Sequence, residues 1–475
     1  MNGTLQSQEN PSPRPRRSWF IVGGCLLVML IALLLPRERQ HGNEHDAFTN
    51  ALPNSGLTNS FATDRARRFT RASSVADGPA QTADEIVAGK VKQFGRSRRE
   101  FVLSIGRRLN KDVPPEIKKF FDALEAGNWE ELDSLWRVLA THSGQYDYST
   151  NHWEEINPFW PAVLDAYGVA EQAHDWPAQK LLDYGNAILD SLRPGMVYVG
   201  GTDPGRWIPE LLNETSGGEP HIMVTQNAFA DSRYLDFMNT LYSDRFATLT
   251  QDESKRAFDE YTADARKRLE HDQQFPDEPK QLRPGEDVRM SDGKVQVSGQ
   301  VAVMAINEKL LQAMMQKNPG TTFAMEESFP FPSTFANAAP LGPIMELGVR
   351  DEQSALTQER AAQSVDYWRD LTRQLLADPD ARDSAEVLKS YSKLVSSQGG
   401  LFASHNFTAE AEQAFRLAVE ICPYSPEAVF RLVNLLVEQH RIDDALPVVE
   451  NAMKADPHYE PLRSLAEELK RKKGN

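Results

Sequence analysis

The sequence predicts a fold of the α+β to α/β class, in which a single N-terminal transmembrane helix precedes a helical region, a small mixed α/β domain and C-terminal α-hairpins. Three observations support this fold: one uncharged apolar run near the start, short apolar runs separated by helical stretches in the middle, and a helical pattern that recurs near the end. The predicted segments are a cytoplasmic tail (1–18), a transmembrane helix (19–36), a flexible linker (37–82), a helical region (83–192), an α/β domain (193–350) and a helical domain (351–475).

The apolar run at residues 19–35 reads WFIVGGCLLVMLIALLL and carries no charge. At about 1.5 Å of rise per residue it is near the lower limit for crossing a hydrocarbon core of about 30 Å. A cleaved signal peptide is the alternative, but the run ends in LLLPRERQ without a small-residue cleavage pattern. We therefore expect a single-pass membrane anchor. Three arginines before the run against two just after it favour a cytoplasmic N-terminus and a periplasmic or extracytoplasmic body.

Composition excludes several classes of function. The formal net charge of −16 repels phosphate backbones and anionic headgroups, so we expect no nucleic-acid partner. The basic strip at residues 90–108 is interpreted as a solvated helix face. Cys25 and Cys422 are the two cysteines, which rules out an intrachain disulfide framework. The ten histidines lack metal-ligand spacing, and neither a metal nor another cofactor is predicted.

Helical periodicity starts at Ala83 and runs to about residue 109. A pair of helices follows, opened by Pro115 and divided at Gly127. The apolar residues of this pair are predicted to be core rather than a ligand site: Phe120, Phe121, Leu124, Trp129, Leu132, Leu135 and Trp136.

Between residues 195 and 349 the pattern changes to short strands. GMVYVG (195–200) and HIMVTQN (221–227) enclose a helix-like stretch, which is typical of a parallel βαβ unit. TTFAME (321–326) and PIMELGV (343–349) are further strand candidates. VRMSDGKVQV (288–297) has Asp-Gly at its centre and predicts a β-hairpin.

Polar residues follow three of these strands and form the candidate ligand site. If the three strands are parallel neighbours, their carboxyl ends meet at the edge where open α/β sheets bind ligands. The candidate residues are Thr202, Asp203, Arg206, Gln226, Asn227 and Glu326, with Glu327 and Ser328 beside them. Arg206 and the first amides of the following helix would favour an anion, and Asp203 would orient a hydroxyl group or cap the helix.

A purely structural role for the same residues is the alternative. Asp203 before Pro204 is a common way to start a helix, and the neighbouring glycines permit a tight turn. The loop GGTDPGR lacks the ending of a Walker loop and the spacing of a dinucleotide-binding loop. No catalytic residue is predicted, because no nucleophile motif is present.

Four positions near the C-terminus recur after thirty-four residues, as small Ala, larger apolar residue, small Ala and Pro. The two sets are Ala411, Phe415, Ala418 and Pro423, and then Ala445, Val449, Ala452 and Pro457. This spacing resembles the tetratricopeptide repeat over residues 392–470. Since about three repeats are needed for an independent stack, we expect this short array to lean on the neighbouring domain.

Several longer phrases carry a second resemblance. VYVGGTDPGRW, VTQNAFADSRYLDFMNTLY, VQVSGQVAVMAIN and CPYSPEAVFRLVNLL resemble an uncharacterised family of bacterial membrane-anchored proteins with C-terminal repeats, over residues 83–457. The first phrase is also similar to the soluble C-terminal part of bacterial membrane proteins that resemble protein O-mannosyltransferases. This sequence has only one apolar span and lacks their multi-span catalytic portion, so the resemblance implies a common architecture and no reaction.

Two functions from different classes are therefore expected. The first is a membrane-anchored scaffold or adaptor that binds a protein partner through the α/β domain and the repeat-like helices. The second is a sugar-phosphate or glycan-binding, transferase-like module with its site at the strand ends near Asp203 and Arg206. Whether there is an enzymatic activity stays open.

Overall fold

The computed structural model describes residues 81–142, 153–201, 203–283, 286–291, 294–326, 332–349 and 354–474. The predicted cytoplasmic tail and transmembrane helix, and the linker up to residue 80, lie outside the described residues. Within the described ranges, no helix combines the length and the apolar content that crossing a bilayer requires. The described chain is mostly helical around a small mixed sheet, which confirms the α+β class in its broad form.

A five-stranded sheet lies at the centre, in the order β2-β1-β5-β7-β6. Its strands are β1 (Val197–Gly200), β2 (Ile222–Thr225), β5 (Phe323–Met325), β6 (Ala339–Leu341) and β7 (Ile344–Leu347). β1 pairs in parallel with both β2 and β5, so the three strands are parallel neighbours, which was the condition for the candidate site. β7 is antiparallel to β5 and to the edge strand β6, which the sequence did not predict. With three residues and Pro340 in its middle, β6 carries too short a pattern to be recognised.

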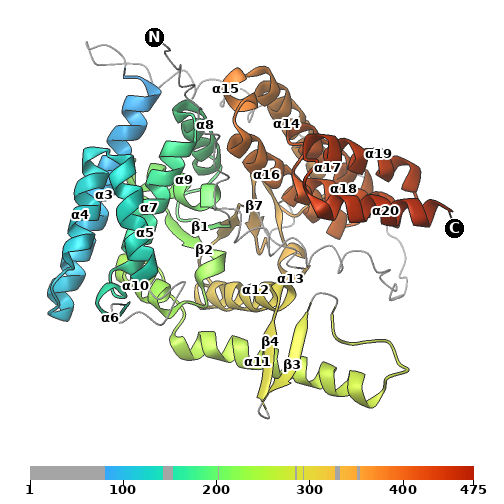
Figure 1. Ribbon diagram of the computed structural model, residues 1–475, viewed down its shortest axis with the longest axis horizontal. Coiled ribbons are helices and arrows are strands. Elements are labelled where there is room, and N and C mark those ends of the chain that lie inside the picture. Colours follow the sequence, from blue (N-terminus) through green and yellow to red (C-terminus); the bar gives the residue numbers. More distant parts are fainter. Residues whose placement is uncertain are drawn as a thin grey trace, which may run out of the picture.

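The N-terminal helices and the repeat-like helices gather at opposite ends of the molecule, with the sheet between them (Figure 1). The first group is α3 (Ala83–Leu109), α4 (Pro115–Ala126), α5 (Trp129–His142), α6 (Trp153–Ile156), α7 (Trp160–Asp175), α8 (Ala178–Leu189) and α9 (Asp203–Glu214). Gly127 ends α4 in the left-handed conformation, with φ of 73°, at the predicted break. Helix α9 connects β1 to β2 and packs on α7 and α8.

The predicted core of α4 and α5 is confirmed in part. Phe120, Phe121, Leu124 and Leu132 are buried. The other three residues are only partly buried: Trp129, Leu135 and Trp136. The two tryptophans interleave with α7, where Trp136 lies between Trp160 and Tyr167 with ring centroids 4.8 and 4.1 Å away.

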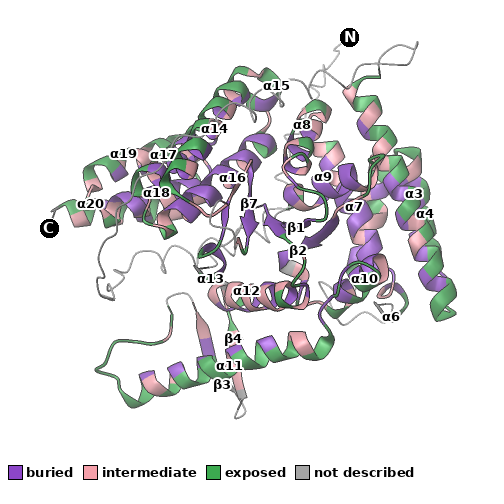
Figure 2. Cartoon of the chain, turned by 180° about the vertical axis from the view of Figure 1, so that it is seen from behind, coloured by how far each residue is buried: buried purple, intermediate pink, exposed green. Residues whose placement is uncertain are grey.

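The second group of helices is α14 (Gln358–Ala377), α15 (Pro379–Arg382), α16 (Ala385–Ser404), α17 (Thr408–Ile421), α18 (Pro426–Glu438), α19 (Ile442–Ala455) and α20 (Glu460–Gly474). From α16 to α20 each helix packs on the next. All six recurring alanine and larger apolar positions are buried, as Figure 2 shows for the inner faces of these helices. Both recurring prolines lie just past a helix end, so the local pattern is confirmed.

Gln398 joins α16 to the sheet. Its side-chain amide donates to the carbonyl oxygens of Gly342 and Ile344 at the β6–β7 turn, at 2.9 Å each. Its carbonyl oxygen accepts from Ser364 and from the indole of Trp368 on α14, at 2.5 and 3.0 Å. The helical array therefore leans on its neighbour, as the short repeat number predicts.

A separate projection, here called the arm, consists of α11 (Gln251–Gln274) and the antiparallel strands β3 (Asp287–Ser291) and β4 (Lys294–Ser298). The arm extends away from the sheet below α12 (Gln300–Lys317) in Figure 1. A capping box between Thr250 and Glu253 starts α11. The strands are those of the predicted hairpin, which is confirmed.

Candidate functional site

The carboxyl ends of β1, β2 and β5 meet at one edge of the sheet. The chain leaves β1 for β2 on one side and returns to β5 on the other side, so this edge is the topological switch point of the parallel part. Open α/β sheets bind ligands in the crevice at such a point. A ligand site of this fold is therefore expected at this edge.

Of the six predicted site residues, the structure brings Asp203, Arg206 and Glu326 together around the first turn of α9. Gln226 follows β2 in a short 3-10 helix, η1 (Gln226–Ala228), and is buried. Thr202, Glu327, Ser328 and the side chain of Asn227 lie outside the described residues.

The Glu326 carboxylate occupies the start of α9. One oxygen accepts a hydrogen bond from the Tyr184 hydroxyl at 2.7 Å, and the other accepts from the backbone amide of Gly201 at 3.0 Å. The residue is only 1% exposed, and its carboxyl group lies against Gly205. Helix N-termini favour negative charge. The chain thus supplies its own carboxylate at the position where the sequence predicted an external anion.

The close approach of Glu326 explains why position 205 requires glycine. A Cβ atom there would lie 1.7 Å from the Glu326 carboxyl carbon. We expect Gly205→Ala to destabilise the fold by about 1–3 kcal/mol through overpacking, although alanine is the better helix former. Gly89→Ala in α3 is the matched control, since a Cβ there meets nothing within 4 Å, and it should stabilise the protein. Thermal unfolding measures both, and a stable Gly205→Ala protein would contradict the packing described here.

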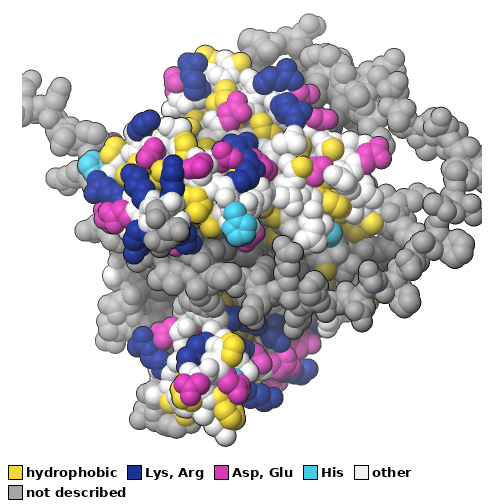
Figure 3. All heavy atoms as spheres, turned by 90° about the vertical axis from the view of Figure 1, so that its right-hand side faces the viewer, with side chains coloured by type: hydrophobic (Ala, Val, Ile, Leu, Met, Phe, Trp, Pro, Cys, Tyr) yellow, Lys and Arg dark blue, Asp and Glu magenta, His cyan; other side chains and the backbone are white. Residues whose placement is uncertain are grey.

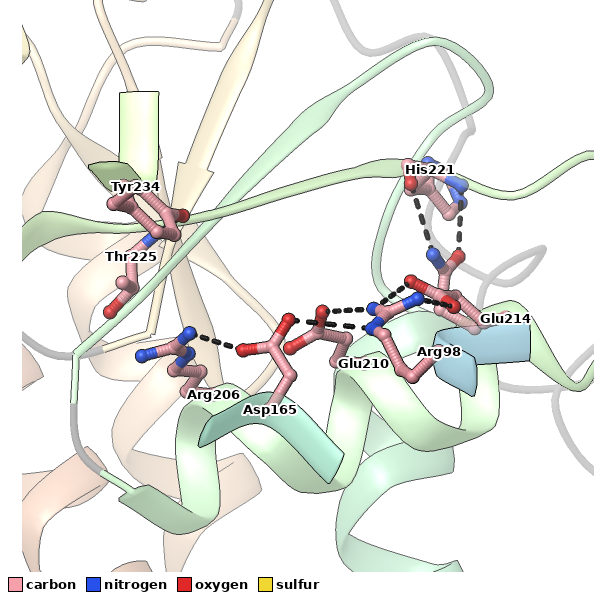
Figure 4. A network of polar contacts seen from close by, with 9 residues as sticks. Arg98, Asp165, Arg206, Glu210, Glu214, His221, Thr225 and Tyr234 are labelled. Atoms are coloured by element: carbon pink, nitrogen blue, oxygen red, sulfur yellow. Dashed lines mark hydrogen bonds and ion pairs between the residues drawn. The ribbon is translucent and has the colours of Figure 1, made fainter. Parts of the chain in front are cut away.

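Arg206 lies beside the carboxyl end of β2 and points toward Asp165 of α7 (Figure 4). Its guanidinium forms an ion pair with Asp165 of α7 and lies 5.6 Å from the ring centroid of Tyr234 on α10 (Ser232–Tyr242). Burial would lower the pKa of Arg206, but Asp165 and Glu210 outweigh it and raise the pKa. Arg206 is therefore a charged internal residue rather than an open anion ligand.

Asp165 also contacts Arg98, so the ion pair is part of a larger network (Figure 4). Arg98 of α3 is 1% exposed and donates to Glu210 at 2.8 Å and to both oxygens of Glu214 at 2.6 and 2.7 Å. Its Nε lies 3.5 Å from an Asp165 oxygen. Two arginines and three carboxylates thus connect α3, α7 and α9 in a layer with little access to water.

The network sets three carboxylates against two guanidinium groups. Burial, together with Asp165 and Glu214, raises the pKa of Glu210 well above its ordinary value, although Arg98 and Arg206 oppose the shift. Buried ions of this kind are stable only when they are paired and hydrogen-bonded, as the guanidinium groups of Arg98 and Arg206 are here.

A small cavity beside the network is lined by Asp165, Arg206, Glu210, Thr225 and Tyr234, with apolar neighbours from β1, β2 and α10. Its volume is about 10 Å³. This is room for about one water molecule, whereas pockets for drug-sized ligands are of about 300–1,000 Å³. The cavity cannot hold a sugar phosphate.

Several carboxylates lie near the start of α9, where Asp203 interacts with Glu171 of α7 and with the charges of Arg206 and Lys393. Asp203 is accessible to solvent, yet the surrounding protein raises its pKa by desolvation, against the opposing charges of Arg206 and Lys393. Glu171 of α7 is partly buried nearby. Desolvation, followed by the charges of Asp203, Asp175 and Asp133, raises the pKa of Glu171 to about 7.

Arg98, the central residue of the network, was not among the predicted site residues. Arg98 belongs to the basic strip that was interpreted as a solvated helix face, and this interpretation is wrong for Arg98, although Lys92, Arg96, Arg107 and Arg108 are exposed as expected. Arg98 lies four residues after Phe94 and four before Val102, on the buried stripe of α3. This four-residue spacing from two apolar residues was the signal in the sequence that Arg98 is buried. Asp165, Glu210 and Glu214 gave no comparable signal.

Comparisons with known proteins add no relative: no protein-family model, no curated protein and no solved structure matches this chain. The described residues also contain no group of three or more His, Cys, Asp or Glu side chains placed to hold a metal ion.

Proposed function

We propose that the protein is a non-catalytic, membrane-anchored scaffold, whose soluble body lies outside the cytoplasm and docks a protein partner through the α/β domain and tetratricopeptide-like hairpins. The observation that carries this proposal is the pairing of Arg206 with Asp165. Arg206 is the predicted site residue most suited to bind an anionic ligand, but its guanidinium is already paired inside the protein. The Glu326 carboxylate occupies the N-terminus of α9 beside it. The anchor and its orientation rest on the sequence alone.

The outer surface of the hairpins is polar and charged rather than hydrophobic, so we expect a partner to dock there through polar contacts. Figure 3 shows Lys or Arg side chains interspersed with Asp or Glu side chains over this end of the molecule. Among the described residues, none of the large exposed hydrophobic side chains belongs to α14–α20. Interfaces between soluble partners are commonly of this mixed composition at their rims.

A photo-reactive residue at an exposed position tests the scaffold directly. We expect Arg369 of α14, replaced by such a residue in the full-length protein, to trap one discrete protein in the intact envelope, and the same replacement at Arg107 of α3 to trap none. No adduct from either position would argue against docking on the hairpins.

The second candidate is a glycan-binding module, favoured by the solvent-accessible Asp203 at the switch point. Carboxylates at a sheet edge would hold hydroxyl groups better than phosphates. A ligand at one hundred times its Kd stabilises a protein by about 2.7 kcal/mol. Saturable thermal stabilisation of the full-length protein by glucose 1-phosphate or a neutral oligosaccharide, lost in Asp203→Ala and kept in Arg96→Ala, would replace the scaffold proposal with this one.

A further inference from the structure

The arm ends in a sheet of only two strands. β3 and β4 pair with each other from Asp287–Ser298 to Ser291–Lys294, and among the described strands neither has another neighbour. A two-stranded sheet is marginal in water, and stability normally requires a third strand or a packed helix. Here α11 covers part of one face, and β3 remains an edge strand.

The arm also carries much of the exposed apolar surface. Four of the seven large hydrophobic side chains exposed in the described chain lie in it or beside it: Phe258 (46%), Phe275 (42%), Met290 (50%) and Val303 (55%). A groove of about 390 Å³ runs between α11 and the strands, lined by Phe258, Val295, Val297 and the β3 residues Asp287 and Arg289, among others. Such surface on a projection is typical of an interaction site.

The backbone of β3 offers hydrogen bonds at its free edge. Ser291 and Lys294 are the last pair of the ladder, and two residues separate them in the sequence. In a hairpin with a two-residue loop this pair is hydrogen-bonded, and every second pair along the antiparallel ladder is then hydrogen-bonded as well. Asp287 and Arg289 accordingly direct their amides and carbonyls to β4. Val288 and Met290 direct theirs outward.

The charged side chains of β3 favour a second copy of β3 as the strand that pairs with this edge. In an antiparallel pairing of β3 with itself about a two-fold axis at Val288, each Asp287 lies opposite Arg289 of the other copy. Asp287 and Arg289 are 41% and 75% exposed. Within one chain they lie 2.8 Å apart, and the Ser298 hydroxyl donates to the second Asp287 oxygen at 2.9 Å. Opposite charges across a ladder stabilise it, and like charges destabilise it. The charge pattern Asp-Val-Arg is therefore complementary to itself in this register.

We propose that the free edge of β3 pairs with β3 of a second copy of this chain, which forms a symmetric dimer through a four-stranded sheet. The two-fold axis exchanges hydrogen bonds between the two Val288 residues and places two Asp287–Arg289 pairs around them. The α11 helices of both copies lie on the same face of the joined sheet. A two-fold, self-complementary interface of this kind is the commonest way for identical chains to associate.

Charge exchange in the full-length protein tests the dimer. Light scattering on the detergent-solubilised protein should give the mass of two chains for the wild type. Arg289→Asp and Asp287→Arg each set two pairs of like charges against each other, and each should raise the dimer dissociation constant about tenfold or more. The double variant Asp287→Arg with Arg289→Asp restores both pairs and should restore the dimer.

The matched control is Lys255→Asp, which breaks an exposed ion pair with Asp259 on α11 and leaves every residue of β3 unchanged. It should leave the mass unchanged, and circular dichroism should show the same helix content in all variants. A monomeric wild-type protein, a double variant as weak as the single ones, or a dimer indifferent to all three changes would each overturn the proposal. A monomer that binds an added peptide strand at β3 would do so as well, and would assign the edge to another partner.

Discussion

Replacing Arg98 with alanine should lower the free energy of unfolding by about 3–5 kcal/mol. The change leaves Glu210, Glu214 and Asp165 without the guanidinium that lies among them in a buried layer. Isolated charges are far more costly to bury than paired ones, because the interior solvates them poorly. Urea unfolding of the full-length protein in detergent micelles, followed by tryptophan fluorescence, measures the loss.

Arg96→Ala is the control for this prediction. Arg96 lies on the same helix two residues earlier, is 68% exposed, and faces Glu125 at 3.5 Å. Exposed ion pairs contribute about 0–1 kcal/mol, so this variant should remain close to the wild type. Equal effects of the two alanine substitutions would show that the Arg98 network is not the buried, charge-dependent structure described above.

The free energy of unfolding of the wild-type protein should fall as the pH rises, and Glu171→Gln should remove this fall. The pKa of Glu171 is about 7 in the folded protein against an ordinary 4.5, so the folded state binds the proton more tightly than the unfolded state. Stability therefore falls as the pH rises from about 4.5 to 7 and is constant above that range for this group. The total loss is up to about 3 kcal/mol. Unfolding free energies of both proteins at pH 5 and pH 8 measure it.

Glutamine should keep the hydrogen bond to Tyr167 and remove the charge that faces Asp203, Asp175 and Asp133. The variant is thus expected to match the wild type at pH 5 and to exceed it at pH 8. Glu130→Gln, an exposed change on α5, should shift neither value. A wild-type protein whose stability is flat between pH 5 and pH 8 would contradict the environment assigned to Glu171.

Local patterns predicted much of the fold because they depend on neighbours in the chain. The apolar runs at GMVYVG, HIMVTQN and TTFAME all became strands of one parallel set, and the Asp-Gly hairpin formed as expected. What the pattern could not provide was strand direction. PIMELGV is as apolar as a parallel strand, yet β7 runs antiparallel to β5 and also forms a short hairpin with β6.

The sequence predicted where the candidate site residues lie, but it did not predict what they bind. Asp203, Arg206 and Glu326 do meet at the strand ends. The sequence assigned Arg206 to a ligand, whereas its partner Asp165 lies 41 residues earlier on another helix. Pairings over such distances depend on how helices pack, and no local period encodes that. The same limit hid the partners of Arg98, since Glu210 and Glu214 lie more than one hundred residues away in α9.

The contacts of Gln398 restrict how this architecture can be divided. Its amide supplies partners to two carbonyl groups of the β6–β7 turn, and its oxygen serves two donors of α14, all from a buried position. A recombinant fragment that starts after β7 would lack the two carbonyl groups to which the Gln398 amide donates. The complementary fragment, which ends with β7, would lack α16, which packs on that strand. Gene fusion or domain shuffling should therefore transfer the sheet and the hairpins together, as one inherited unit.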